Sequence, residues 1–200
     1  MEPLLFLALT KLLESMSSNR LFNLADNEFQ FWRPFAYQGT EIHFDHLVAR
    51  KHTYIHPERK EQYTLYITLS HHVFTVDPDK SKDPNGPQIY PHKPKDPRAF
   101  CPTRYALSFH LTTILETLPE QFCYHGGYSR YCTCKLEDDD GNEIFYQVVF
   151  RVWKEQGKMR FHVESAYPLP TRPSKVKKVN FWVICHNLLN NKKLPKPSTK

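Results

Sequence analysis

The sequence predicts an α+β fold, with an antiparallel sheet of about five to seven strands and helices packed on one face. Runs that alternate apolar and polar residues, typical of half-buried strands, occur near 41–76 and again over 131–170. Between them, residues 102–118 carry apolar side chains at helical spacing. Two hundred residues, 40% of them hydrophobic, suffice for one core, so we expect 1–200 to form a single domain.

The first element is an apolar segment that predicts an amphipathic helix over 1–18. Its apolar run is too short to span a membrane, and Glu2 stands where a signal peptide would have a basic start. The 5 cysteines follow no regular spacing, which favours reduced thiols. We therefore expect a cytoplasmic protein with no membrane partner.

Two alternating runs predict strands over 41–48 and 63–76. In the first, His46 shares a face with the apolar residues. In the second, His71 ends the apolar face, while His72 lies among hydroxyls on the opposite face. A lone histidine on a core face is more often structural than catalytic, but two adjacent histidines at a strand end weaken that interpretation.

Residues 77–98 contain six prolines and no hydrophobic run, which predicts a surface loop. The helix predicted over 102–118 follows, with Arg98 and Arg104 on either side of its start. The amino end of a helix favours anions, so the two arginines suggest a phosphate site. An equally good interpretation is that both arginines are solvated or pair with acidic residues of the loop.

The longest pattern is a hairpin over 143–170 with its turn at 156–158. On the first strand, Arg151 interrupts the polar face. On the second, the apolar residues Met159, Phe161 and Val163 share a face with Ser165 and Tyr167. Hydroxyls thus appear where the strand ends, a place where sheets often present polar groups to ligands. The alternative is an ordinary sheet edge with a buried tyrosine.

The remaining segments complete the sheet. Residues 138–142 read as a hairpin loop, 179–184 as a final strand and 190–200 as a flexible basic tail. No glycine-rich phosphate loop, nucleophile elbow or HExxH motif is present, which disfavours nucleotide-hydrolysing and dinucleotide-binding folds.

The charge balance favours an anionic partner. Twenty-seven Lys and Arg against 21 Asp and Glu leave a net charge of +6, and nucleic acid is the commonest such partner. RNA cleavage without a metal requires a base, cations around the phosphate and an acid, and histidine suits the proton steps. The candidate catalytic residues are His71, Arg104, Ser165, Tyr167 and His46, and the candidate substrate-binding residues are Arg98, His72, Thr75 and Arg151. We expect no cofactor and no catalytic metal.

The run FHVESAYPL at 161–169 resembles the strand ending in Ser/Thr-Ala-aromatic-Pro of the barnase–EndoU–colicin E5/D–RelE group of bacterial and phage toxin ribonucleases. This resemblance implies a small α+β fold that cleaves RNA without metal. It also implies that Ser165 lines the active face with support from Tyr167, and that an antitoxin or immunity protein is a partner.

Two other functions fit the sequence. One is a non-catalytic basic module of a bacterial or phage system, which would bind nucleic acid or an acidic protein through the same face. The other is a structural zinc protein built on Cys101, Cys123, Cys132 and Cys134. RNA cleavage products and metal analysis distinguish the three functions.

Overall fold

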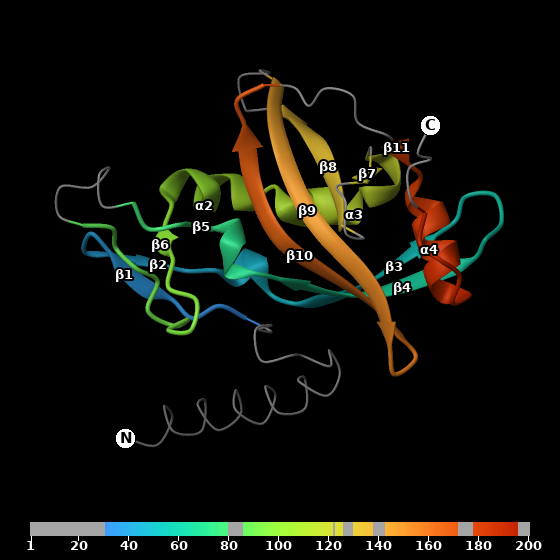
Figure 1. Ribbon diagram of the computed structural model, residues 1–200, viewed down its shortest axis with the longest axis horizontal. Helices are drawn as coiled ribbons and strands as arrows, with labels where there is room; N and C mark the ends of the chain where they lie inside the picture. Colours follow the sequence, from blue (N-terminus) through green and yellow to red (C-terminus); the bar gives the residue numbers. More distant parts are fainter. Residues whose placement is uncertain are drawn as a thin grey trace.

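The computed structural model describes residues 31–79, 86–121, 123–125, 130–137, 143–171 and 178–195, the side chains of 125, 130–137 and 143 excepted. A seven-stranded sheet of order β11-β7-β8-β9-β10-β4-β3 forms its centre (Figure 1). Its strands are β3 (Arg50–Ile55), β4 (Gln62–Leu69), β7 (Cys123–His125), β8 (Arg130–Glu137), β9 (Glu143–Glu155), β10 (Lys158–Leu169) and β11 (Lys178–Val179). The predicted α+β class is confirmed.

One strand pair departs from the predicted antiparallel arrangement. β10 pairs with β9 through the expected hairpin, but its other edge pairs with β4 in parallel. The turn at Gln156 and Gly157 has φ values of 47° and 77°. Positive φ at both central residues is the geometry of a tight two-residue hairpin. The parallel pair joins the two halves of the chain into one sheet.

The helices are short. They comprise α2 (Pro102–Ser108), α3 (Leu111–Glu116), α4 (Phe181–Leu189) and the 3-10 turns η1 (Asp45–Leu47), η2 (His71–Val73) and η3 (Leu118–Glu120). The pairs β1 (Phe35–Tyr37) with β2 (Thr40–Ile42) and β5 (Thr75–Val76) with β6 (Ala99–Phe100) form two further sheets at one end of the molecule (Figure 1). In this view α2 and α3 cross behind the central sheet.

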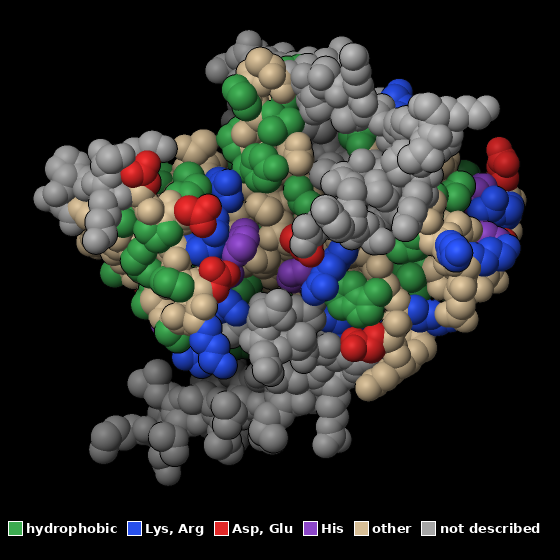
Figure 2. Space-filling view, in the orientation of Figure 1, with side chains coloured by type: hydrophobic (Ala, Val, Ile, Leu, Met, Phe, Trp, Pro, Cys, Tyr) green, Lys and Arg blue, Asp and Glu red, His purple; other side chains and the backbone are tan. Residues whose placement is uncertain are grey.

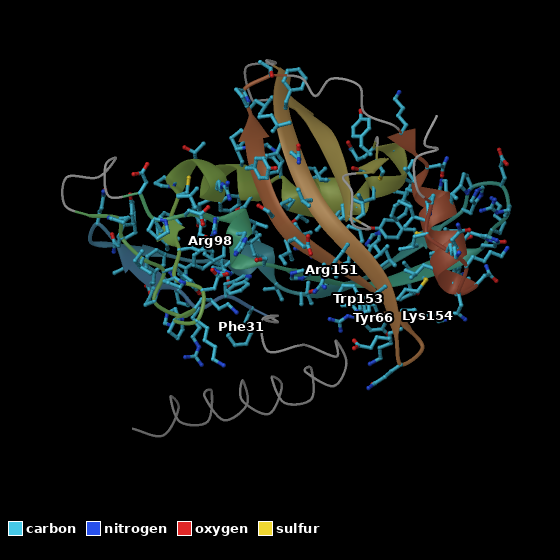
Figure 3. The ribbon with its side chains drawn as sticks, viewed as in Figure 1. Phe31, Tyr66, Arg98, Arg151, Trp153 and Lys154 are labelled. Atoms are coloured by element: carbon cyan, nitrogen blue, oxygen red, sulfur yellow. The ribbon has the colours of Figure 1, made fainter. Side chains whose placement is uncertain are left out.

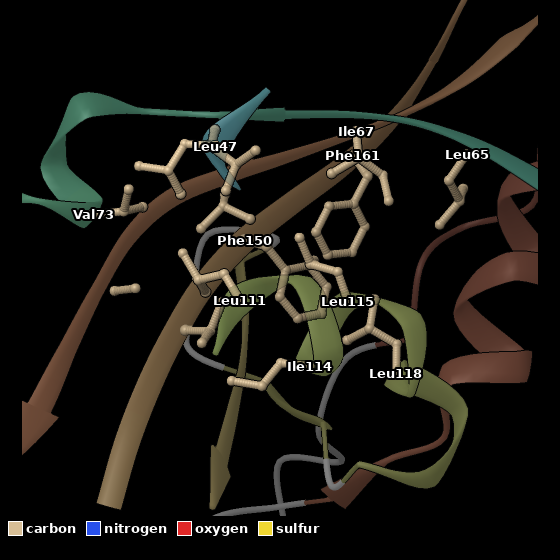
Figure 4. Close-up of a cluster of buried hydrophobic side chains, with 14 of the residues drawn as sticks. Leu47, Leu65, Ile67, Val73, Leu111, Ile114, Leu115, Leu118, Phe150 and Phe161 are labelled. Carbon is tan, nitrogen blue, oxygen red and sulfur yellow. The ribbon is translucent and has the colours of Figure 1, made fainter. Parts of the chain in front are cut away.

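The main core lies between the central sheet and the helices (Figure 4). Phe150 of β9 stacks on Phe161 of β10 at 4.4 Å between ring centroids. From the helical side, Leu111, Ile114, Leu115 and Leu118 are buried against this layer. The alternation predicted for the hairpin is confirmed here, because its apolar side chains on this face are buried.

Several predicted elements have different extents. The strand predicted over 179–184 is wrong, because Asn180 accepts a hydrogen bond from Trp182 N at 2.8 Å and caps α4. The helix predicted over 102–118 is broken into α2, α3 and η3. The strands predicted over 41–48 and 63–76 end at Ile42 and Leu69 and continue as the turns η1 and η2.

The other boundary predictions have mixed outcomes. The prediction of a purely surface loop over 77–98 is wrong at Tyr90, which is 1% exposed and contacts Phe74 at 5.1 Å between ring centroids. In the predicted tail over 190–200, the described part folds back on α4, where Asn187 Nδ2 donates to Lys193 O at 2.8 Å. The predicted helix over 1–18 and loop over 138–142 lie outside the described residues. No helix within the described ranges is long and apolar enough to cross a membrane.

Candidate functional site

A pocket of about 680 Å³ opens on the face of the sheet opposite the helices. Figure 2 shows histidine, basic and acidic side chains together in a hollow on this face. The lining residues come from β9, β10, η2 and the loop before β6: Ser70, His71, His72, Lys93, Lys95, Asp96, Val149, Arg151, His162, Glu164, Ser165 and Tyr167. Most of these side chains are polar or ionisable.

A β-bulge places the hydroxyls of β10 in this pocket. Val163 lies opposite Phe150, but Ser165 lies opposite Val149, so the register shifts by one residue at Glu164. The bulge reverses the alternation that follows it. Ser165 and Tyr167 therefore line the pocket, whereas Ala166 is buried in the core. The prediction that both hydroxyls share a face with Phe161 is wrong for this reason.

The two adjacent histidines converge on one carboxylate. Asp96 Oδ2 lies 2.8 Å from His72 Nε2 and 3.3 Å from His71 Nε2. In a strand, neighbouring side chains would point to opposite faces, as the sequence predicted. The chain instead leaves β4 at Leu69 and forms η2, whose curvature turns both rings toward Asp96.

Hydrogen bonds hold the backbone of η2 in place. Ser70 Oγ accepts from His72 N at 3.2 Å, and Thr75 Oγ1 donates to His71 O at 2.8 Å. Arg104 Nη1 donates to His72 O at 2.9 Å and to Thr75 O at 2.7 Å. Its guanidinium also lies over the Tyr167 ring, 5.2 Å from the centroid. Arg104 thus connects η2 to β10 at the pocket.

Burial controls the charge of the inner histidines. Desolvation lowers the pKa of His71 to about 4, and the neighbouring His72 lowers it further while Asp96 opposes the shift. Desolvation also lowers the pKa of His162 to about 3, with Arg151 and Arg160 adding to the effect. Both rings are therefore neutral near pH 7. His162 Nδ1 lies 2.8 Å from Thr68 Oγ1.

The carboxylate at the centre is ionised. Partial burial acts to raise the pKa of Asp96, but the hydrogen bond from His72 and the electrostatic interactions with His71, His72 and Arg98 outweigh it, so the pKa is lowered. Desolvation lowers the pKa of the nearby Lys93. Two carboxylates, Asp96 and Glu164, line the pocket, and Glu164 Oε1 lies 3.5 Å from Arg151 Nε. Lys93, Lys95 and Arg151 outnumber them, which suits an anionic ligand.

The structure brings five of the nine predicted site residues together. His71, His72, Arg151, Ser165 and Tyr167 all line the pocket. Thr75, Arg98 and Arg104 lie behind it. Thr75 is buried. Arg98 Nη1 lies 2.5 Å from Asp77 Oδ1, and Arg104 Nη1 donates a hydrogen bond to the His72 carbonyl oxygen of η2. Arg98 thus pairs with an acidic residue of the loop, as the alternative interpretation predicted, and Arg104 donates to backbone carbonyls. Neither arginine lines the pocket.

His46 does not belong to the pocket. The turn η1 directs its ring to α2, where Nε2 lies 2.7 Å from Ser108 Oγ. The ring also stacks on Phe109 at 3.8 Å between centroids. The structure does not bring His46 to the other candidate catalytic residues, because the strand predicted to carry it to the sheet ends at Ile42.

Sequence reasoning missed the other ionisable lining residues: Lys93, Lys95, Asp96, His162 and Glu164. The signal for His162 and Glu164 was present, since alternation places both on the polar face of β10. Asp96 and the two lysines come from a proline-rich loop whose path no periodicity predicts. Of the proposed zinc cysteines, Cys101 precedes α2, and the buried Cys123 begins β7. The side chains of Cys132 and Cys134 are not among those that the structure describes.

Cationic and aromatic side chains alternate on the same face of the sheet, next to the pocket, and one of them, Arg160, is fully buried. The ammonium groups of Lys51 and Lys158 lie 6.0 and 5.3 Å from the Tyr66 ring centroid. The guanidinium groups of Arg151 and Arg160 lie 4.6 and 5.3 Å from that of Trp153. Figure 3 shows Arg151, Trp153 and Tyr66 following one another along this part of the sheet. We call this group of six side chains the cation–aromatic row.

Comparison with known protein families identifies the family of this chain. The profile of the YjaZ family matches residues 34–189, which include the whole pocket. The chain belongs to the YjaZ family. Its similarity to Protein YjaZ of Escherichia coli (strain K12) is 39% identity over 176 residues, covering 86% of this chain and 98% of that protein. No solved structure matches the chain.

Proposed function

We propose that the pocket binds single-stranded RNA and cleaves it by acid–base chemistry, which makes the protein a cytosolic endoribonuclease. The observation that carries this proposal is the His72–Asp96 contact of 2.8 Å in a pocket that also contains Lys93, Lys95 and Arg151. A carboxylate fixes the orientation of an imidazole and stabilises its protonated form. The cations provide the charge that a phosphodiester needs in its transition state.

The lining residues fit the steps of such a reaction. Asp96 engages Nε2 of His72, so Nδ1 is the atom that takes the proton of the ribose 2′-hydroxyl. The 2′-oxygen then attacks phosphorus, forming a 2′,3′-cyclic phosphate and releasing the 5′-oxygen. Tyr167, whose hydroxyl accepts from Gln147 Nε2 at 3.0 Å, is the candidate donor of the proton to that oxygen. Arg151 and the lysines contact the phosphate.

His71 and His162 have supporting roles in this scheme. Their pKa values of about 4 and about 3 leave them neutral, so neither is a proton donor near neutral pH. The toxin resemblance of 161–169 adds that an acidic antitoxin or immunity protein would cover the pocket. Its carboxylates would occupy the positions of the RNA phosphates.

The test is cleavage of a single-stranded RNA in the presence of EDTA. The products should carry 2′,3′-cyclic phosphates, and a substrate with 2′-deoxyribose at the cleaved position should remain intact. His72→Asn should lower kcat by about 10²-fold or more, since it removes the base. The control is His43→Asn, which changes an exposed histidine that also contacts a carboxylate, Glu41 at 3.4 Å, outside the pocket. Intact RNA with the folded wild-type protein, or equal activity of His72→Asn, would exclude the proposal.

The cation–aromatic row supports a second candidate function, binding of nucleic acid without cleavage. Alternating cations and aromatic rings suit single strands, because phosphates pair with the cations and bases stack on the rings. This function predicts retention of RNA with a steep dependence on salt and no cleavage products. The cleavage assay therefore separates the two functions directly.

A further inference from the structure

The arrangement of His71, His72 and Asp96 suits metal coordination as well as proton transfer. The three potential ligand atoms, one from each side chain, all lie within 4.8 Å of one another. Within the described part of the chain, this is the one group of three or more His, Cys, Asp or Glu side chains that converges in this way. We propose that these three residues bind one divalent transition-metal ion of the zinc class, through His71 Nε2, His72 Nε2 and an Asp96 carboxylate oxygen.

The distances fit such an ion. In a tetrahedral zinc site with bonds of 2.0–2.1 Å, neighbouring ligand atoms are about 3.3 Å apart. The separation of His71 Nε2 from Asp96 Oδ2 is already 3.3 Å, and that of His72 Nε2 is 2.8 Å. Metal binding requires only a small increase in the distance between His72 Nε2 and Asp96 Oδ2. The protons on the two Nε2 atoms move to Nδ1 or to solvent, as in other histidine sites.

The ligand set also indicates which ions fit. Two imidazoles and one carboxylate suit Zn²⁺, Co²⁺ or Fe²⁺ more than Ca²⁺ or Mg²⁺, which prefer oxygen ligands. Three protein ligands leave a coordination position open. Lys93 and Lys95 line the same pocket, so an anion or water would complete the coordination.

Contacts within the protein hold the side chains of this site in position before any ion binds. His71 is 2% exposed, and its ring lies 5.7 Å from that of Trp32. Arg104 and Thr75 fix the carbonyls of the two histidines. Without an ion, His71 Nε2 lies 3.2 Å from the Asp96 carbonyl oxygen, and an ion on this nitrogen would replace that contact. Little conformational entropy remains to be lost when an ion binds.

The site goes beyond the proposed RNA cleavage and competes with it. An ion on Nε2 of His72 and on Asp96 removes the contact that orients the imidazole as a base. We therefore expect bound Zn²⁺ to inhibit cleavage and EDTA to restore it. The metal site does not depend on the RNA reaction, because binding is measured without RNA.

The experiment is a titration of the purified, reduced, metal-free chain with Co²⁺, followed by visible absorption. Wild type should bind one equivalent, with bands of nitrogen and oxygen ligation and no thiolate band in the near ultraviolet. Asp96→Asn and His72→Gln, checked for folding by circular dichroism, should each weaken binding by more than about tenfold. His43→Gln, in the exposed pair with Glu41, is the matched control and should bind like wild type.

Three outcomes would overturn the site. They are no binding by folded wild type, wild-type affinity in both pocket variants, or a thiolate band that assigns the ion to cysteines. Displacement of Co²⁺ by Zn²⁺ with loss of the visible bands would complete the positive result. None of these readouts depends on RNA, so the outcome is independent of whether the protein cleaves it.

Discussion

The two faces of the central sheet differ in the interactions that stabilise them. On the helix face, Phe150 and Phe161 are fully buried and stack on each other. On the open face, Thr68 and His162 are nearly as buried, yet they are polar and lie 2.8 Å apart. The first face is stabilised by apolar area removed from water, and the second by paired polar atoms. Ionisable groups with strongly shifted pKa values, such as His162, concentrate at functional sites, which makes this face the candidate functional surface.

The largest expected effect comes from the helix face. Phe161→Ala should lower the free energy of unfolding by about 3–5 kcal/mol, since it removes a fully buried ring and leaves a cavity against Phe150. Thr64→Ala, on the open face of the neighbouring strand, should cost about 1 kcal/mol or less, the worth of its contact with Thr53 Oγ1. Urea denaturation measures both. Similar losses in the two variants would contradict the contrast between the faces.

The second effect is specific to the open face and depends on pH. Burial lowers the pKa of His162 to about 3 in the folded state, whereas the unfolded chain protonates near 6.5. The unfolded state therefore binds more protons below 6.5, and stability falls as the pH drops from 6.5 toward 3. The slope is at most about 1.4 kcal/mol per pH unit for this group, or about 2 kcal/mol at pH 5.

His162→Asn, which keeps a polar atom near Thr68, should flatten this slope even if it is less stable at pH 7. The exposed His43→Asn should leave the slope as in wild type. Thermal unfolding across pH 5–7.5 measures the difference. Parallel curves for wild type and His162→Asn would mean that His162 already titrates near 6.5 in the folded protein.

The sequence predicted the helix face well, because alternation alone determines it. The apolar residues of β9 and β10 are where period-two patterning places them up to Val163, and the Gln-Gly turn lies where composition indicated. The wrong predictions lie at segments where local interactions decide between helix and strand and the hydrophobic pattern does not. At 179–184, β-branched and aromatic residues favour a strand, but the Asn180 cap and the buried positions Phe181, Ile184 and Cys185 produce a helix.

The pocket could be predicted only in part. The sequence selected His71, His72 and Ser165, which the structure places in one pocket, but on the basis of a geometry that is not the actual one. The histidines meet because β4 gives way to η2, and Ser165 faces them because of one bulge residue, Glu164. Asp96 reaches the site through a loop that follows no period. A bulge or a short turn changes the side of the sheet to which a side chain points without changing the hydrophobic pattern of the sequence.

The third prediction concerns Arg104, which joins the open face to the helices. Arg104→Met should destabilise the fold by about 1.5 kcal/mol, because the carbonyls of His72 and Thr75 lose a charged donor. It should also reduce Co²⁺ affinity and RNA cleavage, because η2 is no longer held in position. Arg104→Lys, which restores one donor, should recover part of both. A variant with normal metal affinity and cleavage would show that Arg104 supports the fold alone.

The smallest effect compares two lysines of the same hairpin that lie on opposite faces. Lys158 is in the cation–aromatic row, 5.3 Å from the Tyr66 centroid, whereas the ammonium group of Lys154 donates to Leu189 O of α4 at 2.9 Å on the helix face. Lys158→Gln should weaken binding of single-stranded RNA a few-fold and lower the slope of log K against log salt by about 0.7.

Lys154→Gln removes the same charge, so any loss through net charge alone would appear equally in both variants. We expect its RNA affinity to match wild type. Binding to a non-cleavable 2′-deoxy strand at several salt concentrations separates the cases. Equal losses would mean that RNA is attracted by the overall charge of +6 and does not follow the row. A loss confined to Lys158→Gln would place the strand on the open face, on a path that leads past Arg151 into the pocket.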